Sequence, residues 1–184
     1  MKFLKIGIIA VAFLLPVLAP AQVNDDSVRV GVKVTIQQVF DVALIAVYDY
    51  DPSASGNAIP SSDDTVDYFN RTPGTYTVGS TNGTYAVDVQ VSNNTGSTYY
   101  LKLRGTGDFT SGTNTFALSN LKWALDGDPG SQTWTDFTTT YTQIGTGGNE
   151  QKDYYIDYRL VVPWSASAAS NYKTETRYLL TTTP

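Results

Sequence analysis

The residues best suited to chemistry in this 184-residue sequence are carboxylates, because the chain has no Cys and no His. All but two of its 17 acidic residues are Asp. Five of them bracket a Pro-, Ser- and Gly-containing loop over residues 51–64: Asp49, Asp51, Asp63, Asp64 and Asp67. Carboxylates clustered on a loop are ligands for calcium. The alternative is that they are solvated turn residues, since Asp favours turns. Calcium is therefore the one cofactor that the sequence leaves open.

The same composition argues against catalysis. Without Cys or His the common pairs of nucleophile and base cannot be built, and the usual ligands of transition metals are missing. A glycosidase with two carboxylates remains formally open. However, Asp pairs such as Asp25–Asp26 and Asp126–Asp128 lie in expected loops or at strand ends. We therefore expect that the protein is not an enzyme and has no catalytic residues.

Two further sets of residues are candidates for surface chemistry. Trp134, Phe137 and Tyr141 lie in a Thr-rich stretch and are the candidates for an exposed platform that stacks on sugars, whereas core packing accounts for most other rings, including Tyr85 and Tyr99. Three Asn-X-Thr sequons, at Asn70, Asn82 and Asn93, fall in expected turns and are candidate glycosylation sites.

The clearest pattern is an N-terminal stretch in which apolar β-branched residues alternate with mostly polar ones. Its apolar positions are Val28, Val30, Val32, Val34 and Ile36. A period of two predicts a strand with one apolar face, and that face has to be covered. The strand either pairs within its own sheet or inserts into an apolar groove of a neighbouring subunit, which is strand addition. A head-to-tail contact of this kind does not close and grows a filament.

Similar alternation along the rest of the chain predicts an all-β fold. Expected strands include Val42–Tyr50, which we expect to be central because it is apolar on both faces, together with Thr65–Phe69, a hairpin of residues 85–91 and 99–104, and later strands at 121–125, 154–162 and 172–180. Residues 133–142 predict one or two exposed strands, and Gly145–Glu150 a flexible loop. About eight to ten strands at regular spacing favour an antiparallel β-sandwich, immunoglobulin-like or jelly-roll. An outer-membrane barrel is the alternative, but the Thr-rich strands are too polar for its lipid-facing band.

The first residues are typical of an export signal. Lys2 and Lys5 precede an apolar run over residues 6–18, and Ala19-Pro20-Ala21 fits cleavage after Ala21. We therefore divide the chain into a signal peptide (1–21), an alternating strand (22–40) and a sandwich domain (41–184). Ten of the 12 basic residues remain after cleavage against 17 acidic ones, a net charge of −7. We expect a secreted protein without a further membrane span and without affinity for nucleic acid.

Export signal, alternating strand and Cys-free Thr-, Tyr- and Gly-rich sandwich together resemble the subunits of extracellular donor-strand fibres, such as TasA-like biofilm fibres and archaeal bundling pili and threads. The segments 68–75 and 172–180 are also similar to secreted fimbrial and cell-wall-associated sandwich domains. The resemblance covers the mature chain in architecture, without a diagnostic motif. It implies a structural, homopolymeric protein of the cell surface. The alternative is a monomeric adhesin or module that binds cell-surface glycans or cell wall.

Overall fold

A computed structural model describes residues 34–53, 58–79, 84–125 and 132–184. The chain divides into two units, Met1–Ile36 and Gln37–Pro184. The second unit is the sandwich, so its boundary lies a few residues before the expected one at residue 41. Val28, Val30 and Val32 of the alternating strand lie outside the described residues. Among the residues that the structure describes, no helix is long and apolar enough to cross a membrane.

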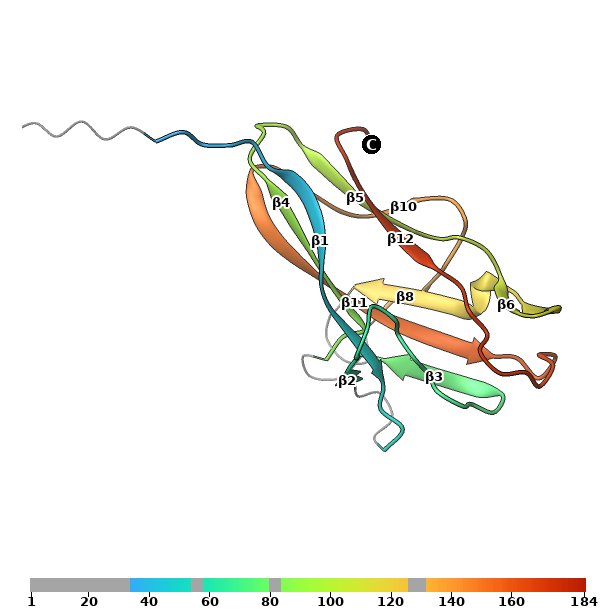
Figure 1. Cartoon of the computed structure of the whole chain (residues 1–184). Helices are drawn as coiled ribbons and strands as arrows, with labels where there is room; N and C mark the ends of the chain where they lie inside the picture. Colours follow the sequence, from blue (N-terminus) through green and yellow to red (C-terminus); the bar gives the residue numbers. More distant parts are fainter. Residues whose placement is uncertain (1–33, 54–57, 80–83, 126–131) are drawn as a thin grey trace, which may run out of the picture. The chain divides into compact units, whose positions relative to one another are not determined.

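The larger sheet contains seven strands in the described residues, all paired antiparallel (Figure 1). Along the sheet the order is β2 (Ala58–Pro60), β1 (Phe40–Tyr50), β4 (Val87–Asn93), β11 (Glu150–Val162), β8 (Leu121–Leu125) and β9 (Thr135–Asp136). The seventh strand, β3 (Gly74–Val78), pairs with the second half of β11. The long β11 is thus the central strand of this layer.

The smaller sheet has the order β10 (Thr142–Gly147), β5 (Tyr99–Gly105) and β12 (Thr176–Thr181). A short hairpin of β6 (Phe109–Ser111) and β7 (Asn114–Phe116) and a 3₁₀ turn at Leu118–Asn120 complete the fold. The protein is therefore an all-β sandwich of antiparallel sheets, as the sequence predicts.

Alternation along the strands builds the core between the two sheets. The inward residues Val89 and Val91 of β4 and Leu101 and Leu103 of β5 are at most 1% exposed. Tyrosine pairs also join the layers: the hydroxyls of Tyr99 on β5 and Tyr154 on β11 lie 2.8 Å apart. The core is thus held by apolar packing and by buried hydroxyl pairs, without disulfides.

Three local predictions are wrong. Residues 65–69 form no strand, although the N–H of Tyr50 donates to the carbonyl of Asp67. The segment Gly145–Glu150 is the end of β10 and the start of β11 rather than a flexible loop. The two strands expected as a hairpin, β4 and β5, do not pair: β4 pairs with β1 and β11, while β5 pairs with β10 and β12. The turn after Asn93 therefore crosses from one sheet to the other.

Gly145 lies in β10 where the register against β5 shifts, between Gln143 and Gly145. The packing there leaves no room for a side chain. A Cβ atom at Gly145 would overlap the ring of Tyr154, whereas a Cβ atom at Gly148 would meet nothing within 4 Å. We expect Gly145→Ala to lower the free energy of unfolding by about 1–3 kcal/mol, the usual cost of overpacking, and the control Gly148→Ala to change it little. Urea denaturation of both variants measures this, and equal midpoints would contradict the packing argument.

Candidate assembly surface

The carboxylates expected to bind calcium serve the loop backbone instead. Asp49 accepts a hydrogen bond from the N–H of Asp67 at 2.8 Å, and Asp67 accepts one from the N–H of Phe69 at 2.6 Å. Asp51 and Asp63 accept hydrogen bonds from the N–H groups two residues further on. Among the described residues, which include all five carboxylates, no group of three or more acidic side chains is arranged to hold a metal ion. Four of the five carboxylates accept hydrogen bonds from backbone N–H groups, and the five do not form such a group.

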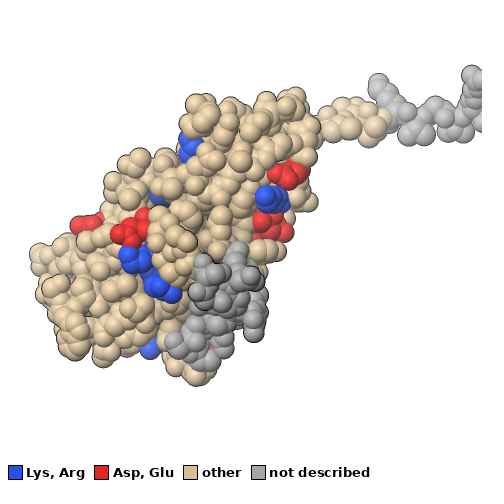
Figure 2. Space-filling model, turned by 180° about the vertical axis from the view of Figure 1, so that it is seen from behind, with Lys and Arg blue, Asp and Glu red and all other residues tan. Residues whose placement is uncertain are grey.

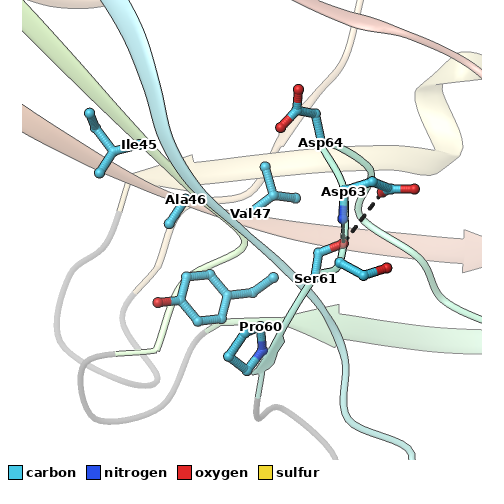
Figure 3. Close-up of a pocket in the computed structure, with 9 residues that line it drawn as sticks. Ile45, Ala46, Val47, Pro60, Ser61, Asp63 and Asp64 are labelled. Atoms are coloured by element: carbon cyan, nitrogen blue, oxygen red, sulfur yellow. Dashed lines mark hydrogen bonds between the residues drawn. The ribbon is translucent and has the colours of Figure 1, made fainter.

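A shallow hollow of about 320 Å³ lies where residues 61–64 pass β1. Its lining combines the apolar side chains of residues 45–47 with Ser61, Asp63 and Asp64. Figure 3 shows the carboxylates of Asp63 and Asp64 pointing in different directions, with Asp63 hydrogen-bonded to Ser61. The hollow is open and lacks converging polar groups, which argues against a small-molecule site.

Of the three sequons, Asn70 is exposed, Asn82 lies outside the described residues, and Asn93 is buried. The side-chain amide of Asn93 donates to the carbonyls of Ser97 and Gly148, at 2.8 Å each. Its oxygen accepts hydrogen bonds from the N–H and hydroxyl of Thr95. Asn93 is therefore a structural residue that ties the crossing turn to the segment before β11, and its side-chain amide is buried and hydrogen-bonded within the folded protein.

The expected aromatic platform does not form. Phe137 is 2% exposed and packs edge-on against Tyr158. The half-buried rings of Trp134 and Tyr141 are each covered by a guanidinium, that of Arg159 and Arg104 respectively. These three rings thus make contacts within the protein and do not form a shared exposed surface.

A different set of rings lies on the outer face of the larger sheet. Tyr85, expected to point inward, packs against Tyr48 and Tyr155 with ring centroids 4.9 and 4.7 Å apart. Tyr155 is exposed, and the other two are half-buried. Charged side chains are few and scattered on the face of the molecule drawn in Figure 2, so a charge-based partner is not indicated there.

Of the five alternating residues expected to form a subunit interface, the structure describes Val34 and Ile36. Their side chains are 75% and 78% exposed, and no strand includes them. The first strand begins only at Phe40. The alternating phase nevertheless continues through Phe40, Val42 and Leu44.

These three β1 residues point toward the interior of the sandwich and yet are incompletely covered. They pair with Asn93, Val91 and Val89 of β4, which are all buried, so they lie on the same inner face. Phe40 is nevertheless 37% exposed and Leu44 45%. Burial returns at Val47, beyond a register shift, where Val66 and Tyr68 of the following loop pack against the core. The first half of β1 therefore presents an apolar inner face without a full second layer.

The smaller sheet ends next to this face. β12 contacts β1 across the sandwich and pairs with β5, with Tyr178 opposite Leu103 and Leu180 opposite Leu101. Because Leu101 and Leu103 point into the core, so do Tyr178 and Leu180, which are only half-buried. We call the set Phe40, Val42, Leu44, Tyr178 and Leu180 the uncovered strip. It marks one side of the sandwich, where the larger sheet extends further than the smaller one.

β1 and β12, the two strands that carry the uncovered strip, each have a backbone edge without a described partner strand. β2 pairs only with Tyr48–Tyr50 of β1, and β12 pairs only with β5 among the described residues. Such edges are templates for another strand. The sequence alone does not reveal this surface, because Val42–Tyr50 is apolar on both faces and therefore predicts a central strand.

The structural role of Asn93 gives a test. We expect Asn93→Ala to lower the free energy of unfolding by about 1–3 kcal/mol, since the buried side chain of Asn93 makes several hydrogen bonds to the turn that alanine cannot make. The control Asn70→Ala, at an exposed sequon, should leave it nearly unchanged. Chemical denaturation compares the two, and a silent Asn93→Ala would contradict the proposed role of the amide.

Tyr158 and Tyr178, the second of which belongs to the uncovered strip, predict alkaline instability. The hydroxyls of Tyr158 and Tyr178 lie 2.7 Å apart. Burial raises the pKa of Tyr158 to about 12 and that of Tyr178 well above 10. Unfolded tyrosines deprotonate near pH 10, so the stabilisation is present below pH 10 and is lost as the pH rises from 10 through 12. Urea midpoints between pH 8 and 12 should fall less steeply in Tyr178→Phe than in the control Tyr100→Phe; equal slopes would contradict this assignment.

Comparison of the chain with protein-family models, with curated proteins and with solved structures finds no match. The function is therefore argued from the uncovered strip and from the sequence that precedes it.

Proposed function

We propose that this protein is a structural subunit of an extracellular or cell-surface filament, of the kind found in pili, fimbriae and biofilm fibres. Subunits join head to tail by donor-strand complementation: the alternating segment of one copy, Val28 to Ile36, covers the uncovered strip of the next. The observation that carries the proposal is that inward-facing apolar residues at one side of an otherwise well-packed core are exposed.

Strand and strip match in chemistry and size. The strip is apolar, and so is one face of the alternating segment. Nine residues in a strand span about 30 Å, enough to run past the whole of β12, which has six residues. Val34 and Ile36 are exposed and lie outside any strand, so the described part of the segment belongs to no sheet of its own chain.

Insertion of the donor segment gains free energy at each apolar residue that it buries. Burying a Val or Ile side chain stabilises by about 1.5–3 kcal/mol, and backbone hydrogen bonds to a free edge add to this. Five such residues act together, and the side chains of the strip are covered at the same time. A subunit interface of this type holds without disulfides or metals, which suits a chain that lacks Cys and His.

A second candidate is a monomeric adhesin or glycan-binding module, favoured by the outer cluster of Tyr48, Tyr85 and Tyr155. This candidate explains neither the uncovered strip nor the alternating segment. It predicts dispersed particles in electron micrographs and retention on a glycan surface, whereas the filament proposal predicts fibres.

The proposal is tested by a single charge in the middle of the donor segment. We expect Val32→Asp to abolish fibres, because the carboxylate would be buried without a partner. Lys33→Asp, one residue further on and pointing the other way, should leave them nearly unchanged. Negative-stain electron microscopy of the exported protein scores both variants beside the unmodified chain.

Monomer stability separates assembly from folding. With donation, monomeric Val32→Asp keeps a folded sandwich with a cooperative thermal transition. If Val32→Asp instead unfolds the monomer, the alternating segment is an internal strand of its own sandwich, and the filament proposal is wrong.

A further inference from the structure

The uncovered strip shows which of the two sheets lacks a strand. A strand added to the free edge of β1 would extend the larger sheet sideways and leave Phe40 and Leu44 without a second layer. A strand added beyond β12 would extend the smaller sheet over β1 and cover these residues from the opposite side. The exposure of Phe40 and Leu44, although β1 is fully paired with β4 there, therefore favours β12 as the acceptor.

The strand directions at this side follow from the pairings. Phe40 pairs with Asn93, so β1 begins where β4 ends, and the chain then enters β5 at Tyr99. Thr181 pairs with Tyr100, so β12 ends at that same end of the sandwich. β12 therefore runs opposite to β1. The N-terminal segment leaves the sandwich at this end, because it is joined directly to Gln37, whose carbonyl accepts a hydrogen bond from the Asn94 side chain.

Head-to-tail growth then fixes the direction of the incoming strand. In a chain of like subunits the donor segment leaves its own sandwich at the end where β1 begins and enters the next one at the opposite end. Inside the acceptor it consequently runs in the same direction as β1 and antiparallel to β12. Every strand pair among the described residues is antiparallel, and pairing with β12 keeps this arrangement.

The same segment is poorly placed to cover its own sandwich. It would have to reverse within residues 36–39, whose sequence Ile-Gln-Gln-Val has none of the residues that favour tight turns. The backbone of this stretch is also held by hydrogen bonds. The side chain of Asn94 accepts one from the N–H of Val39 and donates one to the carbonyl of Gln37. After such a reversal the segment would run parallel to β12, whereas every strand pair among the described residues is antiparallel.

We propose that residues 28–36 of a second copy of this chain pair antiparallel with the free edge of β12, Thr176–Thr181, and lie over Phe40, Val42 and Leu44 of β1. This inference rests on the proposed function and names its acceptor. The even-numbered Val and Ile residues point into the core, and Gly31, Lys33 and Thr35 point outward on the same side as the exposed Leu179.

Because the chain has no Cys, introduced cysteine pairs report the contact without background. Leu179→Cys is combined in turn with Gly31→Cys, Lys33→Cys and Thr35→Cys, which covers the three outward registers. Ala43→Cys, on the outward side of β1, is combined with the same three as the matched control set. The exported full-length proteins are oxidised, and disulfides are read on non-reducing gels beside electron micrographs.

We expect a ladder of dimers, trimers and longer species from at least one Leu179 pair, removed by reductant, and none from the Ala43 pairs. A ladder from the Ala43 pairs alone, or fibres without a ladder from any Leu179 pair, would overturn the β12 acceptor while leaving the filament proposal standing. A dimer band without longer species would show closed exchange and overturn the head-to-tail direction. Intrachain disulfides without fibres would refute the proposed function itself.

Discussion

The structure depends on a difference in width between the apolar inner faces of its two sheets. A sheet with one apolar face has to bury it against another layer, and here the larger sheet is wider than the smaller one. The central strands satisfy this requirement: Val89, Val91, Leu101 and Leu103 are almost completely buried. At the side of β1 and β12 it is not satisfied, although the residues there are of the same apolar kind. The free energy left at that side is what another strand can recover.

Where the second layer is missing for other strands, the chain supplies local cover. At the end of β1, Tyr68 from a loop without regular structure stacks on Tyr50 with ring centroids 6.2 Å apart, and Arg71 lies over the ring of Tyr50 at 4.6 Å. Nothing in the described residues does the same for Phe40 and Leu44. This contrast within one strand is in keeping with the proposal that a segment of a second copy covers the exposed half of β1.

The sequence predicts which residues form strands better than it predicts which strands pair with each other. Alternation locates β4, β5, β8 and β11 to within a few residues, because it reports which face of each strand is buried. It carries no information on pairing, and so β4 and β5 were expected as a hairpin although Asn93 and its turn lead from one sheet to the other. Likewise, Asp49 and Asp67 share a loop in sequence, but only the folded backbone shows that Asp49 accepts the N–H of Asp67. Sequence spacing alone therefore does not show which of these carboxylates hydrogen-bond to the backbone.

The two-sided apolarity of β1 has a different meaning at an edge than in the centre of a sheet. A central strand needs apolar residues on both faces because both are covered. Leu44, on the inner face, is 45% exposed, and Ile45, at the register shift, is 52% exposed, so this half-strand is incompletely covered among the described residues. Apolar residues on both faces of β1, which predict a central strand, are thus also consistent with the proposal that this strand becomes interior only after assembly. In the proposed filament, the incoming segment would bury the inner face of this half-strand.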